Sequence, residues 1–294
     1  FDESDPYISA YICTGLKIAE QAGYVTARGP LQRGVEYVKD ALDQEEYRDA
    51  RAYLLWAAAF CDLWADNDDL VPARVAAREL YADRDKLNLY NRANLALALH
   101  YLSRARGMGA EEAQTLAANA AALAADLEAA AKPVGSGAFW GADGTYRYSW
   151  LDNNVEVTAQ VFSALLALKP ESPQVLPAVR WLMAQRQGKH WTSTKDTAAA
   201  VMVLTKYLEG ANELKPDFTA RVFSGDKLVQ ETTFTAGDVF KDAAKVPIPA
   251  MDLQTGDNAI RLEKTGTGNL YWTARLLYLT PSDQVKPSTG VMEM

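Results

Sequence analysis

One run of acidic and amide residues could carry out acid chemistry. It reads Asp66-Asn67-Asp68-Asp69, and a carboxyl group in such a run can donate a proton when a low-dielectric pocket keeps it protonated. The run follows a predicted buried helix and precedes Leu70-Val71-Pro72, where a solvated loop and a helix N-cap are expected. We therefore interpret it as a loop with a capping residue, and acid catalysis is the alternative.

The two histidines do not form a metal site by their spacing. His100 lies in a predicted buried helix, and His190 lies in the loop Gly188-Lys189-His190-Trp191. A zinc site is poorly supported, because no cysteine stands at ligand spacing and no His-Glu pair stands at helical spacing. We expect core packing for His100 and a loop hydrogen bond for His190.

The remaining candidate residues favour structural roles. Ser136 stands between two glycines but lacks the strand-turn-helix setting of a nucleophile elbow. Glu111-Glu112 begins a predicted helix and meets its dipole, while Asp126 and Glu128 are expected on a solvated face. We therefore predict no catalytic, cofactor-binding or metal-binding residue in this chain.

Composition indicates a globular protein. The 294 residues are 49% hydrophobic and 23% charged, and this length permits one or two domains. A net charge of -8 argues against nucleic acid or anionic lipid as a partner, because those contacts need clustered Lys and Arg. Charges interrupt every apolar run before the roughly 20 residues of a membrane helix. Cys13 and Cys61 lie in Ala-rich helical stretches and are expected in the core.

The elements that must position these residues change character near residue 213, from helix-forming to strand-forming composition. Residues 9–16, 158–165 and 197–204 share a pattern of hydroxyl, Ala, small apolar residues and Leu. With two weaker copies, the anchoring alanines recur about every 40 residues, apart from one gap of 66 residues. They are Ala10, Ala52, Ala93, Ala159 and Ala198. Each interval has room for two helices and two loops.

The five anchored helices are predicted to be apolar on nearly every side, as enclosed helices are. Helices with one charged face are predicted between them, over residues 31–43, 71–82, 111–130 and 173–187, with prolines at or near several starts. This alternation favours concentric inner and outer rings, an α/α toroid. An open solenoid of helical repeats is the alternative.

Two β features complete the predicted architecture. Alternating aromatics around Asp143-Gly144 predict a hairpin over residues 139–150, within the 66-residue gap, at one mouth of the ring. Strand candidates then span residues 217–223, 228–235, 245–248, 259–264 and 270–279. About five strands in so short a segment need a partner surface, which indicates half of a sandwich.

Two motifs resemble α-2-macroglobulin and complement thioester domains. Residues 191–200, after a predicted helix with Trp181 and Gln185, are similar to the closing motif of those domains, in which a glycine such as Gly188 ends one helix and Trp191 packs over the connection. Residues 5–12 resemble an earlier inner helix. Residues 146–150 and 153–159 resemble the bacterial branch, and the similarity runs in order through residues 1–281.

The resemblance implies a domain plan and a function. Residues 1–213 would be a toroid thioester-type domain without its N-terminal part, residues 214–281 the second half of a CUB-like β-domain, and residues 282–294 a linker. The parent would be a large extracellular or periplasmic protease inhibitor, either free or anchored to a membrane through a distant part. Its partners would be trapped proteases and other domains of the same chain. No enzyme activity, metal, nucleic acid or direct membrane contact is implied for this segment.

The thioester itself requires a Cys two residues before a Gln. Neither cysteine satisfies this, because Cys13 precedes Thr14-Gly15-Leu16 and Cys61 precedes Asp62-Leu63-Trp64. The family carries the motif upstream of the position equivalent to Phe1, so either it precedes this segment or the protein is a thioester-less relative. Some complement members carry a His near the position of Gln44-Glu45-Glu46-Tyr47 that speeds transfer to hydroxyls. Its absence here predicts transfer to amines.

Two other functions stay open. A toroid enzyme is one, either glycan-active or similar to class II terpene cyclases, whose acidic cluster is spelled like the run ending at Asp69. It would need a cavity lined by carboxylates and aromatics, whereas the predicted inner helices offer mainly Ala, Leu and Val. A helical binding scaffold without covalent chemistry is the other, and it would present an open concave face.

Overall fold

The computed structural model describes residues 4–24, 28–64, 68–141, 153–210, 215–238, 241–272 and 274–276. The chain forms two compact units, Phe1–Tyr207 and Leu208–Met294. The described residues contain nine α-helices and two small antiparallel sheets, which confirms a mainly helical chain with a minor β part. The predicted linker over residues 282–294 lies outside the described residues.

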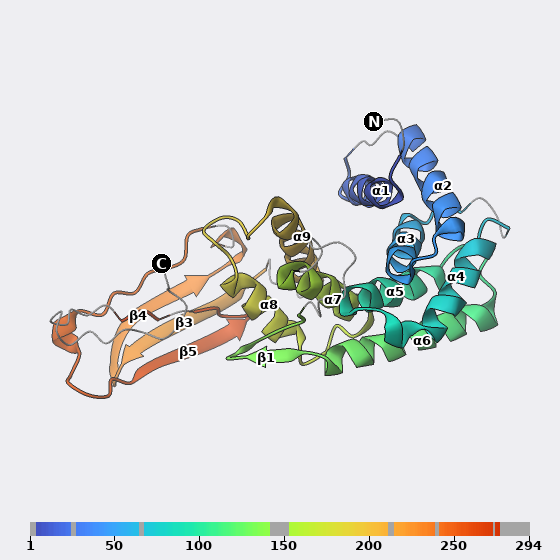
Figure 1. The fold of residues 1–294 in the computed structure, drawn as a ribbon. Helices are drawn as coiled ribbons and strands as arrows, with labels where there is room; N and C mark the ends of the chain where they lie inside the picture. Colours follow the sequence, from blue (N-terminus) through green and yellow to red (C-terminus); the bar gives the residue numbers. More distant parts are fainter. Residues whose placement is uncertain are drawn as a thin grey trace, which may run out of the picture. The chain divides into compact units, whose positions relative to one another are not determined.

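The helical unit contains both predicted sets of helices. The first set is α1 (Pro6–Gln21), α3 (Arg48–Cys61), α5 (Leu89–Leu102), α7 (Asn154–Leu168) and α9 (Thr194–Gly210). The second set is α2 (Arg28–Gln44), α4 (Val71–Ala82), α6 (Ala110–Ala129) and α8 (Val175–Ala184), with a short 3-10 turn η1 (Arg84–Lys86) after α4. In Figure 1 the first set follows a curved row and the second set lies on its outer side. We term these the inner and outer helices.

Local signals explain where the inner helices begin. Asp5 accepts a hydrogen bond from the Ile8 N–H over 2.9 Å, and Pro6 occupies the first turn of α1. Asn88 and Asn153 cap α5 and α7 in the same way. The predicted acidic cap of α4 is wrong, because Leu70 occupies the cap position and no side chain caps that helix.

Burial separates the middle of the inner row from its ends. Ten of the fourteen residues of α5 are buried, and α3 and α7 are similar. The ends of the row differ, because Ile8 and Ile12 of α1 are 51% and 53% exposed and Val201 and Met202 of α9 are 47% and 45% exposed. The prediction of helices enclosed on every side is therefore confirmed for α3, α5 and α7 and wrong for α1 and α9. Each of the latter two has a neighbouring inner helix on one side only.

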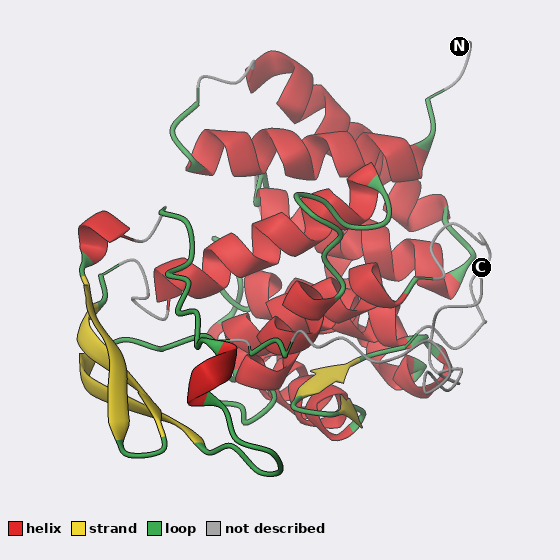
Figure 2. Cartoon of the chain, turned by 90° about the vertical axis from the view of Figure 1, so that its left-hand side faces the viewer, coloured by secondary structure: helices red, strands yellow, loops and turns green. Residues whose placement is uncertain are grey.

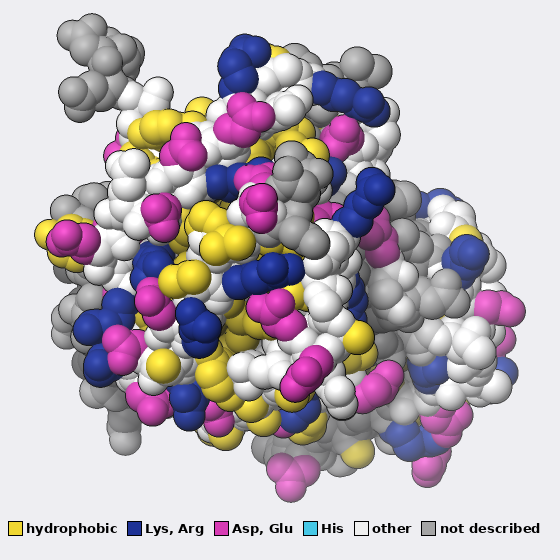
Figure 3. Space-filling model, turned by 90° about the vertical axis from the view of Figure 1, so that its right-hand side faces the viewer, with side chains coloured by type: hydrophobic (Ala, Val, Ile, Leu, Met, Phe, Trp, Pro, Cys, Tyr) yellow, Lys and Arg dark blue, Asp and Glu magenta, His cyan; other side chains and the backbone are white. Residues whose placement is uncertain are grey.

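The outer helix α6 also departs from the predicted charged face. Its solvent side is mainly alanine, at Ala117, Ala118, Ala121, Ala122 and Ala125. Figure 3 shows hydrophobic side chains between charged ones on the side of the unit that carries α2, α4 and α6. Alanine on an exposed helix face is explained by high helix propensity rather than by polarity.

Aromatic packing fixes the segment between α6 and α7. Strands β1 (Lys132–Val134) and β2 (Gly137–Phe139) form a hairpin that turns at Gly135, and Phe139 stacks on Trp181 with ring centroids 5.1 Å apart. Trp140 is fully buried and donates its Nε1–H to the Leu127 carbonyl over 2.6 Å. Most of the hairpin predicted over residues 139–150 lies outside the described residues.

The β unit contains a three-stranded antiparallel sheet of β3 (Asp217–Ser224), β4 (Lys227–Phe234) and β5 (Ile260–Thr267), in the order β4-β3-β5 (Figure 2). Short 3-10 turns, η3 (Ala236–Asp238) and η4 (Ala250–Asp252), lie between β4 and β5. Phe218 and Ala220 on one face of β3 are buried, whereas Arg221 on the other face pairs with Glu231. The prediction of a strand over residues 245–248 is wrong, and the described part of residues 270–279 contains no strand.

Both cysteines lie in the core, as predicted. Cys13 is 3% exposed and Cys61 is fully buried, and they pack with Leu31 and Val35. Burial raises the pKa of the Cys61 thiol to about 12, so this thiol is unreactive in the folded chain. The contact between α1 and α2 is close here, because a Cβ built on Gly34 would lie 2.5 Å from Cys13 Sγ.

We expect Gly34→Ala to destabilise the helical unit by about 1–2 kcal/mol, because overpacking outweighs the gain in helix propensity. Gly15→Ala in α1 is the matched control, since a Cβ there has no neighbour within 4 Å. It should stabilise by about 0.5–1 kcal/mol. Urea unfolding measures both changes. Adding Cys13→Ala to Gly34→Ala should recover part of the loss, and a Gly34→Ala protein as stable as the Gly15→Ala protein would contradict the close packing.

Candidate functional site

The most concentrated group of polar side chains lies where the first turns of several inner helices meet. Tyr7, Tyr90, Glu156 and Lys195 belong to the first turns of α1, α5, α7 and α9, and Tyr53 joins them from α3. We term these five residues the inner cluster. It unites residues up to 188 positions apart in the chain. Sequence patterns alone predicted none of these five residues as a site residue.

An ion pair joins α7 to α9 within the inner cluster. Lys195 Nζ lies 2.8 Å from Glu156 Oε1, and these side chains are 26% and 6% exposed. Burial raises the pKa of Glu156, and the nearby Lys195 opposes that shift. Asp196 strengthens the same junction, because its Oδ1 accepts a hydrogen bond from Asn153 Nδ2 over 2.6 Å.

Three phenols occupy the opposite side of the inner cluster. The rings of Tyr7 and Tyr53 stack with centroids 4.2 Å apart, and Tyr90 is hydrogen-bonded to Tyr7 and to Glu156. Burial raises the pKa of all three tyrosines above the ordinary value of 10, so they remain protonated. The inner cluster therefore offers hydroxyl donors, one carboxylate and one cation, and it contains no activated nucleophile.

A row of aromatic rings continues from the inner cluster along α3. Tyr53, Trp56 and Phe60 share one helix face, with centroid distances of 5.5 and 6.1 Å between successive rings. Phe60 then meets Tyr101 of α5 at 5.4 Å. The inner helices therefore contribute more than the Ala, Leu and Val that the sequence analysis assigned to them. The spacing of residues 53, 56 and 60 was the signal that could have identified this face.

The last residue of the acidic run forms a structural tie. Lys39 donates to Asp69 Oδ2 over 2.5 Å and to the Leu63 carbonyl over 2.6 Å, and its ammonium lies 4.9 Å from the centre of a Trp64 ring. Asp69 is therefore ion-paired with a lysine of α2. Asp68 is exposed, and Asp66 and Asn67 lie outside the described residues.

The two histidines have different surroundings. His190 Nδ1 lies 2.7 Å from the Trp191 carbonyl, which confirms the predicted loop hydrogen bond. His100 is only half-buried, with Arg104 Nη1 3.1 Å from its Nδ1, so the prediction of core packing is only partly correct. Burial, helped by the charges of Arg104 and Lys206, lowers the pKa of His100 to about 4.

The predicted connection signature is right for its tryptophan and wrong for its glycine. Trp191 is 4% exposed and donates its Nε1–H to the Leu182 carbonyl over 2.8 Å, so it covers the connection between α8 and α9. Gly188 does not end α8, which stops at Ala184. It adopts a φ of +66° in the turn between Gln187 and His190, a conformation that favours glycine.

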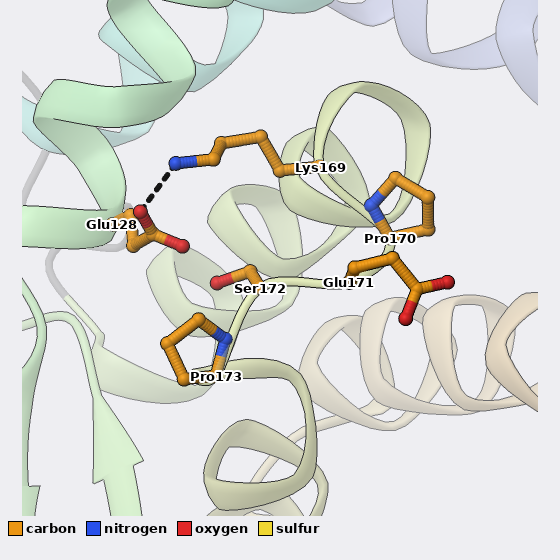
Figure 4. Close-up of a pocket in the computed structure, with 6 residues that line it drawn as sticks. All are labelled: Glu128, Lys169, Pro170, Glu171, Ser172 and Pro173. Carbon is orange, nitrogen blue, oxygen red and sulfur yellow. Dashed lines mark hydrogen bonds and ion pairs between the residues drawn. The ribbon is translucent and has the colours of Figure 1, made fainter.

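A surface depression beside the end of α7 holds a second ion pair. It has a volume of about 440 Å³ and is lined by Glu128, Lys169, Pro170, Glu171, Ser172 and Pro173 (Figure 4). Lys169 pairs with Glu128 across it, and this contact lowers the pKa of Glu128. Asp126 is exposed as predicted, whereas the Glu128 side chain is 22% exposed, so the prediction of a solvated face is only partly correct for Glu128.

The remaining candidates have structural partners. Ser136 lies in the turn of the β1-β2 hairpin, and its carbonyl accepts a bond from Arg180. Glu112 at the start of α6 pairs with Arg74 at 3.2 Å. Among the described residues, no group of three or more His, Cys, Asp or Glu could hold a metal ion, and no helix is long and apolar enough to span a membrane.

Comparisons with known proteins do not assign this arrangement to a family. A scan against protein-family models and a search of the curated proteins both gave no match.

We expect acid to destabilise the chain partly through His100. Its pKa falls from 6.5 in the unfolded chain to about 4 in the folded one, so its contribution is complete above pH 6.5 and is lost as the pH falls toward 4. Because the ring is half-buried, we expect a loss of about 1–2 kcal/mol. His100→Gln should reduce the difference in unfolding free energy between pH 7 and pH 4.5, measured by urea titration, by that amount.

A substitution of Glu156 should have the opposite effect on the same measurement. Its folded pKa lies above the ordinary 4.5, so the folded state holds that proton more tightly and this contribution grows as the pH falls toward 4.5. Glu156→Gln should therefore make the acid loss steeper, whereas His100→Gln makes it shallower. Identical pH profiles for the two variants would contradict both assignments.

Proposed function

We propose that this chain is the thioester-type helical domain and the adjoining CUB-like β-segment of an α-2-macroglobulin-like, broad-spectrum protease inhibitor. The parent protein would enclose proteases that cleave its bait region and capture them covalently through a thioester upstream of this segment. In this proposal the chain has no enzyme activity of its own. It acts outside the cytoplasm, as an extracellular or periplasmic protein.

The observation that carries the proposal is the segment from α7 to α9. Its likeness to the family motif covers residues 153–159 and 191–200, and these residues begin two successive inner helices. Trp191 closes the connection between them through its hydrogen bond to Leu182. The residues of the motif therefore lie where two successive inner helices are connected, as expected for a motif that is characteristic of a domain.

The ends of the inner row support a closed ring. α1 and α9 each bury one side and expose apolar residues on another, at Ile8, Ile12, Val201 and Met202. Apolar surface of this kind is usually covered in a folded protein. We propose that a further inner helix with its outer partner covers both stripes and completes an α/α toroid.

The small size of the sheet supports an incomplete sandwich. One face carries the buried apolar residues Phe218 and Ala220, and the other carries Arg221. Three strands rarely suffice for a stable independent domain. We propose that strands from elsewhere in the parent chain pack on this sheet as the other half of a CUB-like domain.

A non-covalent helical scaffold is the second candidate, and the exposed stripes on α1 and α9 favour it. It would use these stripes to bind another protein. The enzyme alternative is less favoured, because Asp69 pairs with Lys39.

Protease trapping is testable with the full-length product of the gene that encodes this chain. We expect proteases of different specificity, such as trypsin and subtilisin, to lose activity on protein substrates and to keep activity on small peptide substrates. A covalent adduct should persist in denaturing gels. Heat-inactivated protease, which cannot cleave a bait region, is the control. Unchanged cleavage of protein substrates by every active protease would contradict the proposal.

A second measurement tests the predicted preference for amines. The loop at Gln44-Glu45-Glu46-Tyr47 between α2 and α3 contains no histidine, so no imidazole base assists attack by a hydroxyl there. In the full-length protein, methylamine should therefore form more adduct than glycerol, as measured by intact mass. Each adduct should release one reactive thiol, which is distinguishable because Cys13 and Cys61 are buried. Equal or greater labelling by glycerol would contradict the preference, and no labelling by either would identify a thioester-less relative.

A further inference from the structure

Like α1, in which three of sixteen residues are buried, the last inner helix buries few of its residues. Only four of the seventeen residues of α9 are buried, compared with ten of fourteen in α5. Its buried residues are Asp196, Ala200, Val203 and Tyr207. A segment that removes little apolar surface from water opens at a lower free energy than the rest of its domain.

Polar contacts fasten the start of this helix. Asn153 Nδ2 donates to Asp196 Oδ1 over 2.6 Å, and Lys195 Nζ lies 2.8 Å from Glu156 Oε1. We term these four residues the α7–α9 clamp. Such a buried ion pair adds little net stability, but removal of one partner is costly because it leaves a charge without compensation.

Aromatic contacts fasten the two ends of the same segment. Trp191 precedes α9 and bonds to Leu182, and Tyr207 near its end lies 6.0 Å from Phe162 of α7, measured between ring centroids. Between these anchors, Val201 and Met202 are exposed and add little buried apolar area to the attachment of α9. The attachment of α9 therefore depends on a few discrete contacts rather than on a continuous apolar interface.

We infer that α9 is a displaceable helix, which undocks from the helical unit before the rest of that unit opens, and that the α7–α9 clamp sets how often this happens. α9 also leads into the second unit, which begins at Leu208. The inference concerns the 294-residue chain by itself; in the parent protein, the covering helix proposed above would add contacts to α9 and slow its undocking.

Hydrogen–deuterium exchange of the 294-residue chain tests this directly. In the unmodified protein, we expect amides of α9 to exchange at least about tenfold faster than those of α5, through local opening rather than global unfolding. Equal protection of α9 and α5 would overturn the inference, and this comparison needs no variant.

Two variants then test the clamp. Lys195→Met leaves the buried Glu156 carboxylate without its cation, and it should raise exchange in α9 by a further factor of about ten while α3 and α5 stay unchanged. Adding Glu156→Gln removes that stranded charge and should return the rate to within about threefold of the original. Lys169→Met is the matched control, because Lys169 pairs with Glu128 of α6 and not with a residue of α9, and it should leave α9 unchanged. Faster exchange in every helix of Lys195→Met, or no rescue by the second substitution, would overturn the role of the clamp.

Discussion

The helical unit depends on the close approach of its inner helices through alanine. Ala10, Ala52 and Ala93 are fully buried, and Ala159 is 3% exposed. A methyl side chain at such a contact allows helix axes to come within about 8 Å of each other, whereas a larger side chain would force them apart. Buried alanines of this kind allow successive inner helices to lie side by side. Gly34 serves the same purpose where α2 meets Cys13 of α1.

Close packing of these helices also explains the inner cluster. Once the first turns of α1, α5, α7 and α9 meet, any polar side chain there leaves water and needs a partner on a neighbouring helix. Glu156 forms an ion pair with Lys195. Tyr90 is hydrogen-bonded to Tyr7, and Asp196 is hydrogen-bonded to Asn153. Each contact joins different helices, so the polar groups specify register while the apolar groups supply most of the stability. The pKa of Glu156 is raised because this packing excludes solvent from its carboxyl group.

The two ends of the inner row are where this mutual support stops. α5 is covered on nearly all sides, whereas α1 and α9 have inner neighbours on one side only. This partial coverage underlies the proposed closed ring, because an exposed apolar stripe is usually covered by another element. It also underlies the proposed undocking of α9, because a half-covered helix opens at a lower free energy. Of the two ends, α9 is fastened by a buried ion pair and two aromatic anchors.

The sequence by itself determined the order and position of the elements. The motif that recurs about every 40 residues located the five inner helices, and one-sided charge located the four outer helices, because both patterns are local. The sequence also placed both cysteines in the core and Trp191 over its connection. Among the strands, local propensity located β3, β4 and β5 and wrongly added residues 245–248, since propensity does not say whether a strand has a partner. Both edges of β3 are already occupied by β4 and β5.

Only the tertiary structure decided which side chains meet. Lys39 pairs with Asp69, thirty residues later in the sequence, and Asn153 is hydrogen-bonded to Asp196, forty-three residues later. A local pattern reports which face of a helix is buried, but not which helix covers that face. It therefore placed Asp69 at a helix cap and assigned no role to Glu156 and Lys195. Those two charges became a site only when packing brought the first turns of α7 and α9 together.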